Sequence, residues 1–215
     1  MASSWHVVAG NAYIKARALQ AKAKNILTLP TVIDLKKYGK AEIHETDVIT
    51  IGWIGSPTTA KYLQILKDVV LLISKTRKVR FVAIGANENQ VKALGIHALP
   101  WSEKNEVAEI QKFDIGIMPL HDSHFERGKC GYKLLQCMAC GKPVIASAVG
   151  ANTDIVSPGI NGYLANTTEE WTSALYQLID DVQLRADLGA NGRRIVEAQF
   201  ALEPASKALL HMMRS

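Results

Sequence analysis

Cysteine is scarce in this sequence and is confined to one place. The 215 residues contain three cysteines, and all of them lie between Cys130 and Cys140. An odd number of cysteines in one short stretch argues against a disulfide framework and favours a reducing compartment. We therefore expect a cytoplasmic protein.

Long apolar runs are also missing. No run approaches the ~20 residues that a membrane-spanning helix needs, and the first ten residues, MASSWHVVAG, lack the charged and apolar regions of a signal peptide. A peripheral contact with the inner face of the plasma membrane is still compatible with the sequence.

No charge of one sign dominates. The chain has 25 Lys and Arg against 20 Asp and Glu, a formal net charge of +5, and aromatic residues make up only 7%. No long Lys/Arg block alternates with aromatic residues, so we expect no nucleic-acid partner. The modest positive excess suits an anionic ligand such as a phosphate, and a hydrophobic content of 48% is enough for one globular core.

Short apolar runs alternate with helical patterns along the whole chain. Strands are predicted at 5–10, within 26–38 before Pro30, and at 48–56, 79–86, 95–101, 114–120, 142–149 and 161–165. Helices are predicted at 12–24, 58–76, 102–113 and 131–140, and from Glu169 to the end. Because the strands are apolar on both faces, the sequence predicts an α/β fold with a doubly wound, Rossmann-like parallel sheet, which binds ligands beyond the carboxyl ends of its strands.

The first candidate binding segment follows the strand predicted at 48–56. Gly52 and Gly55 lie near the strand end, Ser56 is a candidate helix N-cap, and Pro57 is a candidate first helical residue. A helix that starts there would point free N–H groups at a phosphate. The spacing matches no known phosphate loop, so a plain tight turn is an equal alternative.

The second candidate segment reads RGKCGYKLLQCMACGKP, from Arg127 to Pro143. Lys133 and Gln136 are three residues apart and share one face of a predicted helix. A lysine near a helix N-terminus can bind a phosphate, and an amide one turn further can bind a sugar hydroxyl. A merely solvated face is the alternative. The loop before this helix carries further polar residues: His121, His124, Arg127 and Lys129.

Two patterns that resemble metal-binding motifs have simpler interpretations, and one aromatic residue has two. Cys137 and Cys140 form a CxxC, but a zinc site usually needs a second pair, and a redox CxxC belongs at a helix N-terminus. We therefore interpret these cysteines as small packed residues. His121 and His124 form an HxxH with no glutamate partner, so we predict no metal site. Trp101 either walls a base pocket or belongs to the core.

The segment KLLQCMACGKPVIASAVGANTDIVSPGINGYLA resembles the C-terminal half of retaining glycosyltransferases with the GT-B fold, of the large family-four type. The resemblance extends from about Thr28 to Phe200, and LTLPTVIDLKKY resembles the interdomain hinge of that family. It implies a binding site for a nucleotide-sugar, which is a substrate, and neither a cofactor nor a metal is implied.

The family usually has two glutamates separated by seven residues, and both are replaced here. Gln136 stands where the second glutamate binds the ribose hydroxyls, and Gly128 stands where the first approaches the transferred sugar, with Glu126 nearby. The resemblance makes Arg127 and Lys133 the candidate catalytic residues. The candidate substrate-binding residues are Gly55, Ser56, Trp101, His121, Glu126, Lys129, Gly131 and Gln136.

The resemblance also implies a division of the chain and a set of partners. Residues 1–34 would be the end of an N-terminal domain with the hinge, residues 35–199 the nucleotide-sugar-binding domain, and residues 200–215 a helix that packs back on the N-terminal domain. The expected activity is sugar transfer to a saccharide or lipid-linked acceptor, of the cell-surface polysaccharide or lipopolysaccharide type. Without the acceptor domain the chain would be inactive alone.

Three other functions stay open at this point. An epimerase or phosphorylase with the same fold would carry the same hinge and MACGKP signals. A non-catalytic nucleotide-binding or partner-binding module is compatible with the loss of both glutamates. A redox or zinc protein built on the CxxC would contain metal when purified.

Overall fold

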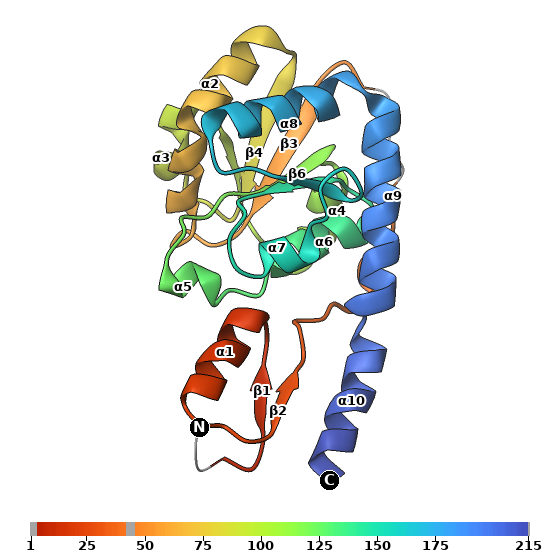
Figure 1. Cartoon of the computed structure of the whole chain (residues 1–215). Helices are drawn as coiled ribbons and strands as arrows, with labels where there is room; N and C mark the ends of the chain where they lie inside the picture. Colours follow the sequence, from red (N-terminus) through yellow and green to blue (C-terminus); the bar gives the residue numbers. More distant parts are fainter. Residues whose placement is uncertain (1–3, 42–45, 215) are drawn as a thin grey trace.

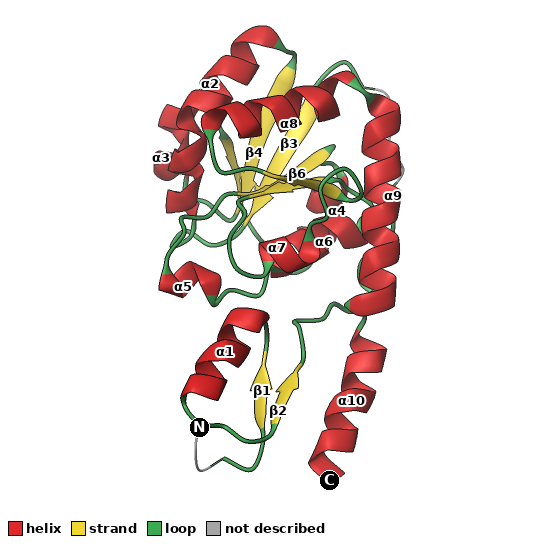
Figure 2. Cartoon of the chain, viewed as in Figure 1, coloured by secondary structure: helices red, strands yellow, loops and turns green. Residues whose placement is uncertain are grey.

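The computed structural model describes residues 4–41 and 46–214, and it divides into an α/β body and a smaller unit (Figures 1 and 2). The body is built on a six-stranded sheet with the order β5-β4-β3-β6-β7-β8, and every neighbouring pair is parallel. The strands are β3 (Ile49–Ile54), β4 (Val79–Ile84), β5 (His97–Leu99), β6 (Ile115–Met118), β7 (Val144–Ala146) and β8 (Gly162–Leu164). The prediction of a doubly wound, Rossmann-like parallel sheet is confirmed.

The chain leaves the sheet centre in both directions. It starts at β3, runs outward through β4 to β5, returns to β6 on the other side of β3, and runs outward again to β8. The strand order therefore reverses between β3 and β6, where Gly52 pairs with Gly116. In such sheets a crevice opens beyond the carboxyl ends of these two strands, because their connections depart in opposite directions.

Helices cover both faces of the sheet, which explains why the strands are mostly apolar on both faces. One face packs against a 3-10 helix (Ala60–Leu66), α2 (Lys67–Thr76) and α8 (Thr168–Asp180), with Trp53 and Trp171 buried between them. The other face packs against α4 (Glu106–Gln111), α6 (Tyr132–Ala139) and α9 (Val182–Gln199). Short helices α3 (Glu88–Val91), α5 (His124–Arg127) and α7 (Asn152–Ile155), and a 3-10 turn at Lys92–Leu94, fill the connections.

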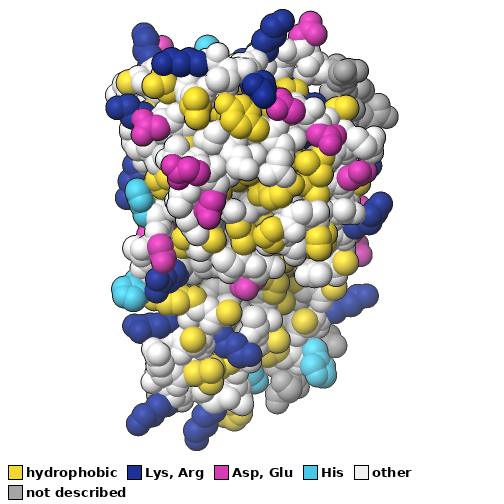
Figure 3. Space-filling model, turned by 45° about the horizontal axis from the view of Figure 1, so that its top comes forward, with side chains coloured by type: hydrophobic (Ala, Val, Ile, Leu, Met, Phe, Trp, Pro, Cys, Tyr) yellow, Lys and Arg dark blue, Asp and Glu magenta, His cyan; other side chains and the backbone are white. Residues whose placement is uncertain are grey.

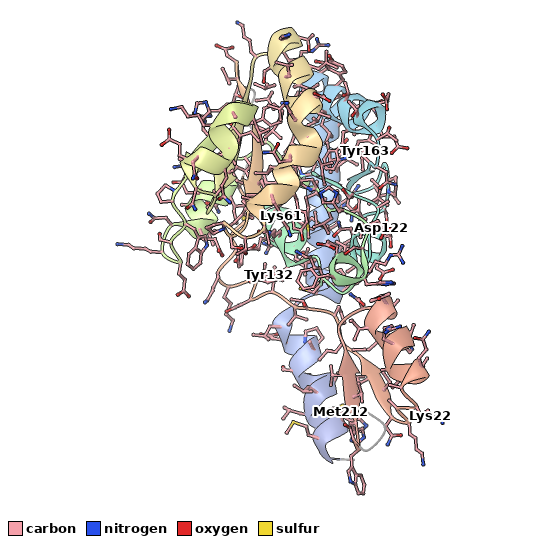
Figure 4. The ribbon with its side chains drawn as sticks, turned by 90° about the vertical axis from the view of Figure 1, so that its left-hand side faces the viewer. Lys22, Lys61, Asp122, Tyr132, Tyr163 and Met212 are labelled. Atoms are coloured by element: carbon pink, nitrogen blue, oxygen red, sulfur yellow. The ribbon has the colours of Figure 1, made fainter. Side chains whose placement is uncertain are left out.

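The smaller unit lies at the end of the body toward which the β3 arrow points in Figure 1. It consists of β1 (Val7–Ala9), α1 (Ala12–Gln20) and β2 (Ile26–Thr28), and the two strands pair in parallel. Helix α10 (Leu202–Arg214) continues from α9 and runs beside this unit (Figures 1 and 4). Ile33 and Ala201 form a backbone bridge, so the chain enters and leaves the body at the same place.

Most predicted elements are present, but two predictions were wrong in detail. The helix expected at 58–76 is split into the 3-10 helix and α2, and the expected start at Ser56 and Pro57 is a turn instead. The single helical region expected after Glu169 is three helices, which break at Asp181 and before Leu202. Asp181 caps α9 by accepting a bond from the backbone N–H of Leu184, which favours a new helix over a continuous one.

Candidate active site at the switch point

A cavity opens where the strand order reverses. Its volume is about 490 Å³, and it is lined by residues at positions 54–56, 59, 101, 106, 118, 120, 128–133 and 136. The end of β3 forms one wall and the end of β6 another, as the topology requires. We call this hollow the switch-point cavity.

Helix α6 carries two predicted site residues into this cavity because of the way it begins. Gly131 precedes the helix with φ +68°, a left-handed conformation that glycine adopts without strain. A Cβ at this position would lie 2.3 Å from Cδ1 of Ile155, so no side chain fits there. The tight start puts Lys133 and Gln136, one helical turn apart, on the cavity wall.

Lys133 is held in the cavity by neighbours that only a folded chain supplies. Its Nζ donates to Oγ1 of Thr59 at 3.1 Å and lies 4.6 Å from the ring centre of Trp53. A Cβ on Gly55 would come within 2.6 Å of this Nζ, so the glycine leaves space for the ammonium group. Burial, with a smaller contribution from the charge of Lys129, lowers the pKa of Lys133 to about 8.

Two further lysines gather beside Lys133 around one tyrosine ring. The Nζ of Lys129 lies 4.6 Å from the ring centre of Tyr62, and the Nζ of Lys61 lies 5.4 Å from it. Burial and the charge of Lys61 lower the pKa of Lys129, although Glu126 opposes this shift. Lys61 and Tyr132 both lie at the end of the body that faces the smaller unit (Figure 4). Clustered cations with lowered pKa values, as at Lys129 and Lys133, favour an anionic ligand beside them.

The charged side chains on one face of the molecule do not gather into a single basic patch. On the face seen in Figure 3, Lys and Arg side chains lie mostly near the outline of the molecule, and most Asp and Glu side chains lie in its upper part. This face shows no continuous basic track of the kind that binds a polyanion.

The other end of the cavity is polar and carries an acidic residue. Glu106 accepts bonds at Oε1 from the hydroxyl of Tyr38 (2.5 Å) and from Nε2 of Gln136 (2.8 Å). Its Oε2 accepts a bond of 2.6 Å from Nε1 of Trp101. Burial, followed by the bond to Glu106, raises the pKa of Tyr38, so this hydroxyl stays a hydrogen-bond donor.

Seven of the ten predicted site residues line the switch-point cavity. These residues are Gly55, Ser56, Trp101, Lys129, Gly131, Lys133 and Gln136. Trp101 is half exposed and is held by its bond to Glu106, so it forms a cavity wall and does not belong to the core.

The remaining three predicted residues lie elsewhere. Arg127 forms a two-point ion pair with Asp122, with Nε–Oδ1 and Nη2–Oδ2 distances of 2.6 and 2.7 Å, and lines a separate hollow beside α1. Glu126 is buried and accepts bonds from Tyr62 and Ser123, which lower its pKa and fix the loop that carries Lys129. His121 packs edge-on against the ring of Tyr62, at 5.9 Å between ring centres.

The turn after β3 differs from the predicted helix start, but it still closes the cavity. The carbonyl of Ser56 accepts bonds from the backbone N–H groups of Thr59 and Ala60. The backbone N–H of Ser56 donates to Oγ1 of Thr59 at 3.1 Å. Thr59 is thereby positioned to accept the bond from Lys133.

The CxxC is part of the hydrophobic core. Cys137 and Cys140 are buried on α6 and at its end, and burial raises the pKa of both thiols, to about 12 for Cys140. Such thiols are poor nucleophiles and poor metal ligands. Within residues 4–41 and 46–214, no group of three or more His, Cys, Asp or Glu side chains could hold a metal ion.

No described helix combines the length and the apolar character needed to cross a membrane.

Sequence reasoning missed three residues of the site: Tyr38, Thr59 and Glu106. Glu106 left a usable signal, because it begins a helix just after a strand whose carboxyl end points to the ligand crevice. Tyr38 left none, because it comes from the segment after the predicted hinge and reaches Glu106 only in the folded chain.

The fold and the cavity define a doubly wound α/β domain with a cationic ligand site at its switch point. The chain belongs to the family described as glycosyl transferases group 1, whose family model matches residues 46–181. The predicted resemblance to GT-B glycosyltransferases of this type is confirmed.

Curated relatives match parts of the chain. A D-inositol 3-phosphate glycosyltransferase of Paenarthrobacter aurescens is 37% identical over 78 residues, which is 35% of this chain and 18% of the relative. A GDP-mannose-dependent monoacylated alpha-(1-6)-phosphatidylinositol monomannoside mannosyltransferase of Corynebacterium glutamicum is 33% identical over 86 residues, 40% of this chain and 23% of the relative. The matched regions thus cover less than a third of these relatives.

Solved structures share the fold along almost the whole chain. The Anabaena protein HepE, in complex with UDP and glucose, has a TM-score of 0.81 at 18% identity, over 97% of this chain and 62% of HepE. S. aureus TarM, in a complex with UDP, also has a TM-score of 0.81 at 17% identity, over 98% of this chain and 44% of TarM. At these identities the likeness shows the fold.

Proposed function

We propose that this chain is the donor-binding part of a glycosyltransferase and that the switch-point cavity binds the nucleoside diphosphate of a nucleotide-sugar. The observation that carries the proposal is the polarity of the cavity, which has Lys129 and Lys133 at one end and Glu106 with Gln136 at the other. A diphosphate matches the first end and a ribose matches the second. The UDP bound to HepE and the GDP-mannose named for the Corynebacterium relative support this ligand class.

The chemistry requires a site that stabilises a leaving group. When the bond between the sugar and the diphosphate breaks, negative charge develops on the diphosphate. Lys133 and Lys129 can stabilise that charge from a partly dry wall, where a fixed ammonium group acts more strongly than in water. Arg127, which is paired with Asp122, is not part of this set.

The acceptor site belongs, in this proposal, to an N-terminal half that residues 1–34 complete and that residues 200–215 pack against. Exposed apolar side chains on the smaller unit and on α10 support a further packing partner there: Trp5, Leu19, Leu210 and Met213. The acceptor would be a saccharide or a lipid-linked sugar of cell-surface polysaccharide synthesis. The protein would work in the cytoplasm, where a lipid-linked acceptor would bring it to the membrane surface.

Titration calorimetry with UDP-, GDP-, ADP- and CMP-linked ligands tests the proposal. We expect one nucleoside diphosphate to bind and to bind equally well in EDTA, because lysines supply the cations and no Asp-x-Asp follows a strand. Cys137→Ala and Cys140→Ala are the controls, which should lower thermal stability and leave affinity unchanged. The proposal fails if no nucleotide binds, and its lysine site fails if binding requires Mg²⁺ or Mn²⁺.

A further inference from the structure

The carboxylate of Glu106 is fixed more firmly than a solvated glutamate would be. Three hydrogen-bond donors from three separate segments converge on it: the Tyr38 hydroxyl, the Gln136 amide and the Trp101 indole. Tyr38 is itself anchored, because Nη1 of Arg193 on α9 donates to its backbone carbonyl at 2.6 Å and also to the carbonyl of Ala139 at the end of α6. Four parts of the chain thus combine to orient one acidic side chain.

This carboxylate also lies at a defined step along the cavity wall. Gln136 is one helical turn beyond Lys133 on α6, which is about 4.5 Å along the helix axis. Glu106 is 2.8 Å from the Gln136 amide and is itself only partly buried on the cavity wall. Glu106 therefore lies about one helical turn along the cavity wall from Lys133. A ligand whose phosphate contacts Lys133 can reach Glu106 with the next part of the molecule.

The chemistry of these two side chains limits what they can bind. Nε2 of Gln136 has two hydrogens, and it donates to Tyr38 (2.9 Å) and to Glu106. What Gln136 can offer a ligand is therefore its amide oxygen, an acceptor. Glu106 is an acceptor as well, with about four lone-pair directions, of which the protein uses three. This end of the cavity favours two adjacent hydroxyl groups and repels phosphate.

We propose that Glu106 is the carboxylate that binds the ribose of the nucleotide, accepting from one hydroxyl of the vicinal diol while the amide oxygen of Gln136 accepts from the other. Carboxylates perform this task in other doubly wound nucleotide-binding domains. In this chain the carboxylate comes from α4, and α6 contributes an amide that holds it in place. The inference rests on the proposed function of the cavity.

The test compares three ligands by titration calorimetry on the wild-type chain. These are the nucleoside diphosphate that binds best, its 2′,3′-dideoxy analogue, and inorganic pyrophosphate. We expect the dideoxy analogue to bind at least tenfold more weakly than the ribonucleotide. Equal affinity for both nucleotides would overturn the inference, and this arm requires no variant. If no nucleoside diphosphate binds, the proposed function fails as well.

Two variants then assign the effect to a residue. Glu106→Gln should weaken ribonucleotide binding about tenfold, abolish most of the discrimination against the dideoxy analogue, and leave pyrophosphate affinity within twofold. Glu109→Gln is the matched control on the same helix, because Glu109 pairs with Lys112 outside the cavity, and it should change none of the three affinities. If Glu106→Gln still discriminates like the wild type, Glu106 only orders Trp101 and Tyr38, and the inference is wrong.

Discussion

At the scale of single residues, the most informative group is the ammonium of Lys133. It lies against the ring of Trp53 and donates to Thr59, and no carboxylate within residues 4–41 and 46–214 forms an ion pair with it. A partly buried cation with no paired carboxylate destabilises the folded chain, and such residues usually serve a ligand. A bound diphosphate would supply the missing negative charge.

Lys133→Met should therefore separate stability from binding. At pH 7 we expect the free energy of unfolding to rise by roughly 1 kcal/mol, because methionine has a similar length and no charge to desolvate. Affinity for the nucleoside diphosphate should fall by about 1.5–3 kcal/mol, the usual loss of a charge-assisted contact. Chemical denaturation and calorimetry measure the two effects. A variant that is less stable yet binds normally would contradict this assignment.

The titration of Lys133 gives a second signature of the same residue. Its pKa in the folded chain is about 8, below its ordinary value, so the charged form is disfavoured by folding. The stability cost is present below pH 8 and disappears as the pH rises toward the ordinary lysine pKa. Binding a diphosphate should restore the charge, so wild-type binding near pH 8 should take up a proton. Calorimetry in buffers of different ionisation enthalpy should show this uptake in the wild type and not in Lys133→Met.

At the scale of elements, the start of α6 decides where the site residues lie. The left-handed Gly131 lets the chain turn from the Lys129 loop directly into the helix, and Ile155 of α7 closes the space beside it. Glu126 fixes the preceding loop through Tyr62 and Ser123. Lys129, Lys133 and Gln136 are therefore all placed by one loop–helix junction.

Gly131→Ala should disturb both the fold and the site. A left-handed alanine costs about 1–2 kcal/mol, and its Cβ would also displace Ile155. We expect lower stability together with clearly weaker nucleotide binding. Gly159→Ala is the matched control, because Gly159 has φ +74° with no atom within 4 Å of a Cβ, so it should lose stability and retain full affinity. Equal binding losses in the two variants would show that the α6 junction has no special role.

At the scale of the whole molecule, the smaller unit is attached to the body next to the site. Nδ2 of Asn11 donates to the backbone carbonyls of Arg127 and Lys129, at 3.2 and 2.9 Å, and Tyr13 bonds to His124 at 3.0 Å. These contacts connect α1 to the same loop that carries Lys129. The smaller unit therefore contacts the loop that supplies Lys129 to the cavity.

We expect the chain by itself to bind a nucleoside diphosphate but to transfer no sugar to an added acceptor. The reason is that the chain corresponds to 62% of HepE and 44% of TarM, so a large part of each of those structures has no counterpart in it. A radiolabelled transfer assay with a bound nucleotide-sugar measures this. Efficient transfer would contradict the assignment of the acceptor site to another part of the protein, and an epimerised or phosphorolysed product would identify one of the rival activities.

The fold class, the order of the main elements and the two segments that line the switch-point cavity could be predicted from the amino-acid sequence. These predictions depend on local signals: short apolar runs indicate strands and a helical spacing of apolar residues indicates helices, whatever the distant residues are. The reversal of strand order then follows from the crossover rules, and it places the site at the ends of β3 and β6. Lys133 and Gln136 could be paired in advance because they share one helix.

Which other residues join Lys133 and Gln136 depends on tertiary packing. Arg127 is adjacent to the motif in sequence, yet Asp122 is close enough to form an ion pair with it and hold it outside the cavity. Glu106 and Tyr38 are 30 and 98 residues away from Gln136, yet they form hydrogen bonds with it. No local propensity encodes such contacts, because they depend on how α4, α6 and the segment after the smaller unit pack around the sheet.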